Sequence, residues 1–259
     1  PIRIVTAEPG GGSDSVARLI AQELTGSLGK QVIVDNRGII GIEITAKAAP
    51  YGYTLLFYGS TVWMQPLLQR HVAWDPIRDL APVTWAIKSP NVLVVHPSVP
   101  VKSVNELIAL AKSKPGGLNY SSGATGTSSH LAAELFKYMA GVNIVRIPYK
   151  SGASEMADLL GGHVQLTFGS GGSVGPHVRS EKLRGLAVTT AEPSALFPNL
   201  PTIAAMGVPG YEAAAMSGVW APAKTPAALI NRLNLDIVRV LNTANVKEKY
   251  FSGGVETVG

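Results

Sequence analysis

Two loops rich in glycine and serine hold the residue types that could bind an anion. Residues 9–14 read Pro-Gly-Gly-Gly-Ser-Asp, and residues 121–129 read Ser-Ser-Gly-Ala-Thr-Gly-Thr-Ser-Ser. Each loop runs into a helical pattern, and a strand that turns through glycine into a helix directs backbone N–H groups and the positive end of the helix dipole toward one point. The pair of loops therefore predicts two donor surfaces that close on one anion, a carboxylate or a phosphate, from opposite sides.

For either loop alone, a tight strand–helix turn that merely needs glycine is the simpler explanation. The pair, with hydroxyl groups at Ser13, Thr127, Ser128 and Ser129, favours binding. A nucleotide cradle is the weaker interpretation, because residues 9–14 lack the Gly-x-Gly-x-x-Gly spacing and neither loop ends in Gly-Lys-Ser or Gly-Lys-Thr. The amides expected to donate are those of Gly11, Gly12, Ser13, Asp14 and residues 126–130.

A hydrolase that uses a serine or histidine near residues 128–130 is the rival interpretation. Residues 171–175 also match the Gly-x-Ser-x-Gly pattern of a nucleophile elbow, which needs a downstream base histidine with an acid between them. The only histidine after Ser173 is His177, no carboxylate lies in the interval, and Pro176 fits such a turn poorly. We interpret this match as chance, and because the sequence offers no base–orienter pair, we expect no catalysis.

Metal and cofactor binding find little support in the sequence. His130 and Glu134 stand one helical turn apart, but two ligands do not make a metal site, and the other histidines are scattered without ligand spacing. The chain has no cysteine, which excludes thiolate zinc sites and thiol catalysis. We therefore expect neither a metal nor a cofactor.

The composition indicates an ordered globular protein with a mildly basic surface. Of the 259 residues, 46% are hydrophobic and 15% are charged, which excludes a disordered chain. The net charge of +5 would draw small anions, whereas the lack of a Lys/Arg cluster with interleaved aromatic residues argues against nucleic-acid binding. No apolar run is long enough to span a bilayer.

Short apolar runs alternate with helical patterns, which is typical of α/β layers. Ser103 with Glu106 predicts a capping box, Thr225 predicts an N-cap with Pro226 at the first helical position, and the glycines at 161–162 predict a helix end. The apolar faces of the helices after the two loops are expected at Val16, Leu19, Ile20 and Leu24, and at Leu131, Leu135, Phe136 and Met139. The expected strands are residues 2–5, 32–34, 53–57, 92–95, 145–147, 164–168 and 186–188.

Two extended stretches bounded by proline, residues 92–100 and 218–223, have the pattern of crossings between domains. If both are hinge strands, residues 1–98 and 220–259 form one discontinuous domain, and residues 99–219 form the other.

Further segments accompany the first loop in a specific order along the chain. They are residues 34–37 (Val-Asp-Asn-Arg), 46–50 with 52–56, 120–130, 147–150 (Ile-Pro-Tyr-Lys), 201–203 and 207–211. Together these segments resemble the Bug family, the extracytoplasmic solute receptors of tripartite tricarboxylate transporters, over nearly the whole chain.

The resemblance implies a periplasmic binding protein fold of type II-like α/β architecture, with two lobes joined by two hinge strands and a ligand cleft between them. It implies capture of a small organic carboxylate by hinge closure, without catalysis, and delivery to the membrane permease subunits of the transporter. We expect a monomer in the periplasm, with the signal peptide removed. A ligand-sensing receptor that feeds a signalling partner remains the alternative role.

The family match places ligand contacts in and around both loops. The candidate ligand-binding residues are Glu8, Pro9, Gly11, Gly12, Ser13, Asp14, Ser60, Ser122, Gly123, Gly126, Thr127, Ser128, Ser129, His130, Pro148, Tyr149 and Gly169.

The chain departs from the family pattern at positions that bear on the ligand. Residues 38–41 are shorter than the usual glycine-rich loop, and the chain ends at Gly259, where relatives usually continue into a further helix. Glu8 replaces a small neutral residue, and its carboxylate would repel an anion unless it points away, is protonated, or pairs with a cationic or hydroxyl group. Gly169 replaces an acidic residue, which disfavours an amino acid as the ligand unless Glu8 supplies the missing charge.

Overall fold

The computed structural model describes residues 1–10 and 12–258, which divide into two compact units. Unit 1 consists of Pro1–Lys88, Met216–Ser252 and Glu256–Gly259, and unit 2 consists of Ser89–Ala215 and Gly253–Val255. The chain passes from one unit to the other within two long strands, β4 (Leu80–Val95) and β9 (Ala214–Pro222), and it returns to unit 2 once more for Gly253–Val255. Both passages come earlier in the chain than the positions near 98 and 220 that the sequence suggested.

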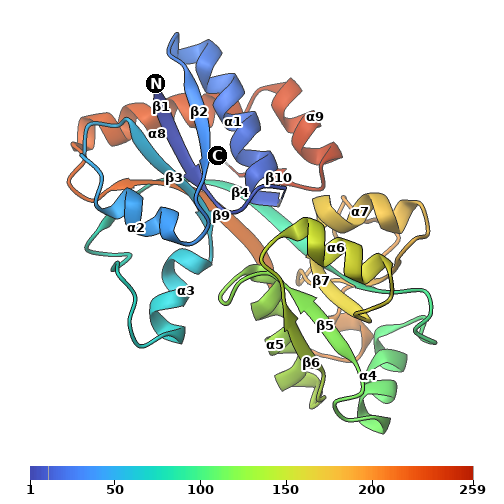
Figure 1. The fold of residues 1–259 in the computed structure, drawn as a ribbon. Helices are drawn as coiled ribbons and strands as arrows, with labels where there is room; N and C mark the ends of the chain where they lie inside the picture. The colour runs from blue at the N-terminus through green and yellow to red at the C-terminus, as the bar shows by residue number, and fades with distance from the viewer. Residues whose placement is uncertain (11, 259) are drawn as a thin grey trace. The chain divides into compact units, whose positions relative to one another are not determined.

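Unit 1 is built on parallel strands with helices on both faces (Figure 1). Its strand order is β2-β1-β3-β9-β4, in which β1 is parallel to β2 and β3 while β9 is antiparallel to β3, and β10 pairs with β4. Its other strands are β1 (Ile2–Thr6), β2 (Val32–Asn36), β3 (Thr54–Gly59) and β10 (Glu256–Thr257). Its helices are α1 (Gly12–Leu28), α2 (Ile40–Ala46), α3 (Thr61–Leu68), α8 (Ala227–Leu241) and α9 (Ala244–Ser252).

Unit 2 repeats the same kind of layering around parallel strands in the order β6-β5-β7. The second part of β4 lies antiparallel to both β7 and β8. The strands are β5 (Asn119–Ser122), β6 (Val145–Pro148), β7 (Leu166–Ser170) and β8 (Arg184–Val188). The helices are α4 (Val104–Ser113), α5 (Ser128–Ala140), α6 (Gly152–Leu160), α7 (Gly171–Arg179) and the 3-10 turn η1 (Ala204–Met206).

Alternation along β4 divides the core of unit 2 into two layers, because successive side chains of a strand point to opposite faces. Leu93 and Val95 enter the core formed with α4 and α5, where Phe136 is fully buried. Val92 and Val94 enter the core formed with α6 and α7. The uninterrupted apolar run at this end of β4 is therefore a strand that is buried on both faces.

The structure confirms the expected α/β alternation and every expected strand, most of them to within one or two residues at each end. Ser103 caps α4 by accepting a hydrogen bond from the Glu106 amide at 3.2 Å, as the capping box predicted. The glycines at 161–162 end α6, where Gly162 adopts a φ of +74°.

Several expectations about elements were wrong. The segment 92–95 is only the end of β4, and the polar strand β5 was missed because its sequence, Asn-Tyr-Ser-Ser, lacks an apolar run. Residues 38–41 include the start of a helix, since α2 begins at Ile40. Pro226 is itself the N-cap of α8, and no hydrogen bond reaches the buried Thr225 hydroxyl from the residues described.

The apolar face expected for α5 was confirmed at Phe136 and Leu135 but was wrong at Met139. Met139 is 36% exposed, whereas the buried positions are Ala132, Ala133, Phe136 and Ala140. Small alanine side chains bring the helix close to β7, so the buried face follows the alanines rather than the largest apolar residues.

Candidate functional site

In unit 1 the candidate residues gather where the parallel strands end. β1 lies between β2 and β3, with Val5 opposite both Asp35 and Leu56, so the segments after these strands leave from one edge. The carboxyl edge of parallel strands is where α/β proteins bind ligands. This edge carries Glu8, Pro9, Gly12, Ser13, Asp14 and Ser60, while the candidate Gly11 lies outside the described residues.

The first loop is fixed from within by Asp14. Helix α1 begins at Gly12, so the amides of its first turn have no acceptor inside the helix. The buried Asp14 carboxylate accepts from the Gly10 amide at 3.0 Å and from Asn36 Nδ2 at 2.9 Å, and it pairs with Arg18 Nε at 3.0 Å. Its side chain is therefore used to hold the loop, and only its backbone amide remains for a ligand.

Burial opposes the charge on Asp14, but the bonds from Gly10, Asn36 and Arg18 outweigh it and hold the pKa of Asp14 below its usual value of 3.8. A group with a depressed folded pKa stabilises the fold above its unfolded pKa, and that contribution is lost as the pH falls through the folded pKa. We predict that Asp14→Asn lowers the free energy of unfolding by about 2 kcal/mol near neutral pH. Urea unfolding at a series of pH values should show the deficit shrinking below about pH 4. A deficit of equal size at every pH would contradict this prediction.

Glu8 and the unusual segment 38–41 are neighbours in the structure. Gly38 has a φ of +57°, and a Cβ there would overlap the Glu8 carboxylate. The Glu8 charge also reaches Tyr58, whose pKa is raised first by burial and then by this carboxylate. Ser60 follows β3 directly and is the N-cap residue of α3. The two departures from the family pattern thus act on one place in unit 1.

In unit 2 the candidate residues again lie at the end of parallel strands. β5 lies between β6 and β7, with Ser122 opposite Pro148 and Ser121 opposite Thr167. The edge therefore carries the second loop, which leads into α5, together with the residues that end β6 and β7. The candidates brought together here are Ser122, Gly123, Gly126, Thr127, Ser128, Ser129, His130, Pro148, Tyr149 and Gly169.

Arg146 on β6 braces the second loop, and the sequence analysis missed it. Its guanidinium donates from Nε to Ser122 Oγ at 2.8 Å, from Nη2 to the Gly123 carbonyl at 2.8 Å, and from Nη1 to Thr125 Oγ1 at 3.0 Å. The planar fork of arginine fits three acceptors placed in this way. A single arginine within an apolar strand pattern does not indicate that its side chain holds a loop elsewhere in the sequence.

The first turn of α5 supplies further groups around Gly126. The Gly126 amide donates to His130 Nδ1 at 3.2 Å, and the pKa of His130 is lowered by burial and then by the Arg146 charge. Nδ1 is thus the acceptor, and the neutral ring carries its proton on Nε2. Glu134 accepts from Tyr120 and Lys137 instead, and the described residues contain no cluster able to hold a metal.

Buried Asn91 on β4 was also missed. Its Oδ1 accepts from Ser128 Oγ at 3.5 Å, while its Nδ2 is buried without a hydrogen-bond partner among the residues the structure describes. Buried amide groups usually have partners, so Asn91 adds a donor beside the start of α5. An isolated asparagine at the head of an apolar run gave no signal in the sequence.

Two other candidates have structural roles. The Tyr149 amide donates to the Ser122 carbonyl, and the Tyr149 hydroxyl donates to the Asp158 carboxylate at 2.7 Å. Burial and then the hydrogen bond to Asp158 raise the pKa of Tyr149 to about 12. Gly169 is buried, and a Cβ there would come within 2.4 Å of Val174 Cγ1. A larger residue at 169 therefore requires the Val174 side chain or α7 itself to shift.

The Gly-x-Ser-x-Gly match does not form an elbow. Ser173 lies inside α7, and its Oγ donates to the Ser170 carbonyl at 2.9 Å. This is an ordinary hydroxyl bond within a helical turn.

The fold is that of a periplasmic solute-binding protein. The family model described as "Tripartite tricarboxylate transporter family receptor" (TctC) matches residues 16–259, so the chain belongs to that family. It is a solute-binding receptor rather than an enzyme, because the family and its solved members are binding proteins. None of the helices in the described part of the chain is long and apolar enough to cross a membrane.

Three relatives illustrate the match. Protein BugT of Bordetella pertussis is 37% identical over 264 residues, which cover 98% of this chain and 80% of that protein. The structure of "R. palustris Rpa4515 with adipate" is 36% identical with a TM-score of 0.95, covering 100% of this chain and 89% of the other. The structure of "periplasmic binding protein BugD" is 28% identical with a TM-score of 0.93, covering 100% and 88%.

Proposed function

We propose that this receptor captures a small organic carboxylate with the backbone N–H groups of both loops and delivers it to the permease subunits of a tripartite tricarboxylate transporter. The main support is that each unit presents a glycine loop and a helix N-terminus at the carboxyl edge of parallel strands. A charged side chain holds each loop, Asp14 in unit 1 and Arg146 in unit 2. The relative that is 36% identical is described with the dicarboxylate adipate.

The donors would act without bond chemistry. The first-turn amides of α1 and α5 and the hydroxyls of Ser13 and Ser129 would bind carboxylate oxygens, directly or through water. The Thr127 hydroxyl instead donates to the Ala124 carbonyl at 2.8 Å. The His130 Nε2–H is a further neutral donor. Preorganised donors favour the anion because the loops need no reordering when it binds.

We further propose that β4 and β9, the strands that carry the chain from one unit to the other, act as hinges. A ligand shifts such an equilibrium only by the difference between its affinities for the open and closed states. Contacts from both loops to one ligand would supply that difference. We expect the receptor to work in the periplasm as a monomer.

The lack of a negative charge at position 169 favours a plain or hydroxylated acid over an amino acid as the ligand. Position 169 holds no carboxylate that could pair with an ammonium group. Glu8 is exposed beside Gly38 and stands as the alternative partner for a cationic or hydroxyl group. Glutarate and glutamate differ by one ammonium group. Their relative affinities therefore distinguish a site for a plain acid from a site in which Glu8 pairs with an ammonium group.

Calorimetric titration of protein freed of retained ligand, by unfolding and refolding, tests the proposal. Adipate, malate, glutarate, glutamate and benzoate form the panel, and we expect at least one plain acid to bind and to raise the melting temperature. At a hundred times Kd, a ligand adds about 2.7 kcal/mol of stability. Absence of heat and of thermal shift with every acid would contradict carboxylate binding, and tight glutamate binding would contradict the assigned preference.

A further inference from the structure

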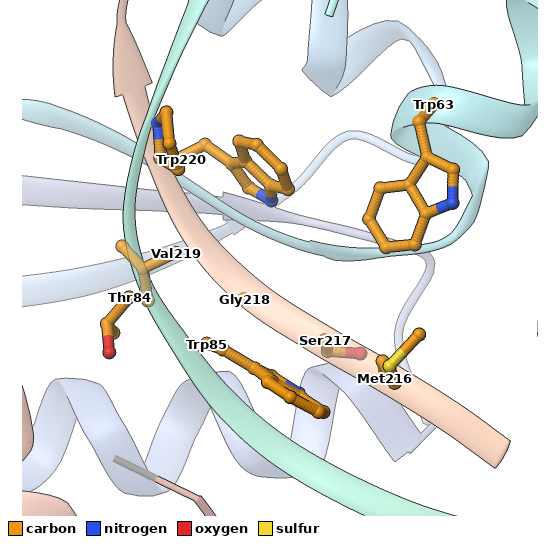
Figure 2. Close-up of a pocket in the computed structure, with 9 residues that line it drawn as sticks. Trp63, Thr84, Trp85, Met216, Ser217, Gly218, Val219 and Trp220 are labelled. Carbon is orange, nitrogen blue, oxygen red and sulfur yellow. The ribbon is translucent and has the colours of Figure 1, made fainter.

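Unit 1 contains a cavity that shares no residue with the two loops. It has a volume of about 200 Å³ and lies among α3, the first part of β4 and β9 (Figure 2). Its lining residues are Trp63, Pro82, Thr84, Trp85, Met216, Ser217, Gly218, Val219 and Trp220. All of these belong to unit 1, so the cavity is a property of that unit alone.

Three indoles and a thioether give the cavity flat, polarisable walls. Trp63 and Trp220 lie with ring centroids 6.0 Å apart at a tilt of 48°, and Figure 2 shows Trp85 and Met216 on the remaining sides. Aromatic faces and methionine sulfur pack well against another ring. No lining residue carries a charge, so an anion entering here would lose hydration without compensation.

One polar group of the wall lacks a partner. Trp220 Nε1 is buried and has no hydrogen-bond partner among the residues described, whereas Trp85 Nε1 donates to the Ile87 carbonyl at 2.8 Å. A Cβ on Gly218 would lie 3.8 Å from Trp220 Nε1 and only 2.8 Å from the Thr84 carbonyl oxygen, so the strand backbone passes close to this nitrogen. An indole N–H can only donate, so the matching group must be an acceptor.

We propose that this cavity binds a small, neutral aromatic molecule that carries one hydrogen-bond acceptor, such as a carbonyl oxygen. The ring would lie among Trp63, Trp85 and Met216, and the acceptor would take the Trp220 Nε1–H. A dry apolar cavity of about 150 Å³ is enough to hold benzene, whereas drug-sized ligands need about 300 Å³ or more. The volume thus fits a single substituted ring.

Indole N–H resonances of ¹⁵N-labelled protein test the proposal, because the chain has four tryptophans and each gives one signal. Benzamide is the probe, and toluene is the matched ring without an acceptor. Benzamide should move the Trp220 signal downfield and should also perturb the signals of Trp63 and Trp85. Toluene should not move the Trp220 signal downfield, because it has no hydrogen-bond acceptor. Trp74 is the internal control, since its Nε1 donates to the Val62 carbonyl and it does not line the cavity.

Substitutions locate the site. Trp85 is 47% exposed, so Trp85→Ala should leave the fold intact and weaken benzamide binding roughly tenfold by removing a wall. Tyr53→Ala removes an exposed ring of unit 1 outside the cavity and should change nothing. Unchanged indole spectra up to the solubility limit of benzamide, or equal binding by Trp85→Ala, would overturn the proposal.

The cavity and the carboxylate function are tested separately. Benzamide is uncharged, so its binding should persist in a Gly126→Val variant and in the presence of saturating adipate. Displacement by adipate would overturn the assignment of a separate site. Failure of every carboxylate to bind, with benzamide still bound, would contradict the proposed function and leave the cavity assignment in place.

Discussion

Arg146→Lys is expected to bind carboxylate about 100-fold more weakly than the wild-type protein. The guanidinium of Arg146 reaches three acceptors on the second loop, and a lysine ammonium cannot span all three from one position. Loss of two bonds at about 1.5 kcal/mol each corresponds to that factor. Calorimetric titration with the acid that binds best among the panel measures the effect.

Arg184→Lys is the matched control for this substitution. Arg184 is also partly buried in unit 2, but it donates to the carbonyls of Val99 and Val101, away from the loop. The control should lose stability without losing affinity. Equal affinity of Arg146→Lys and the wild-type protein would show that the loop keeps its shape without the arginine fork.

Gly126→Val is expected to reduce carboxylate binding by more than about 100-fold, because the loop must change its conformation. Gly126 has a φ of +86°, where a residue with a side chain costs about 1–2 kcal/mol and a β-branched residue costs more. Relief of that strain would turn the amide of residue 126 away from His130 and redirect the donors of the first turn of α5. Thermal unfolding should show only a modest loss of stability.

Gly141→Val controls for backbone strain alone. Gly141 ends the same helix with a φ of +62°, and a Cβ there would meet nothing within 4 Å. This variant should bind normally. Gly12→Val tests the first loop, because a bulky side chain at the start of α1 would keep a ligand away from the amides there. Unchanged affinity in both Gly12→Val and Gly126→Val would contradict a clamp made of two loops.

Local sequence rules predicted the framework of this protein well. A glycine loop before an amphipathic pattern marked the turns that lead into α1 and α5, and Ser103 with Glu106 marked the start of α4. These signals lie within a few residues of one another, and the energies behind them, capping bonds and backbone preferences, are local. The family resemblance came from the same local segments and was confirmed by the family match.

Hydrogen-bond partners that lie far apart in the chain could not be predicted from local sequence patterns. The sequence predicted a role for the Asp14 amide, but it gave no sign that the Asp14 carboxylate accepts a hydrogen bond from Asn36 of β2. Arg146 lies 24 residues from Ser122 and meets it only because β5 and β6 are parallel neighbours. The register between strands decides such pairs, and it depends on the packing of the whole sheet.

The sequence by itself determined that this chain forms α/β layers with two glycine loops that lead into helices, and that it resembles the receptors of tripartite tricarboxylate transporters. Turn chemistry and periodicity depend on contiguous residues, so a local pattern can reveal them. Only the tertiary structure decided what braces each loop, that Glu8 lies over Gly38, and that three tryptophans from α3, β4 and β9 line one cavity. Those features arise from close packing between segments far apart in the chain, which no local pattern specifies.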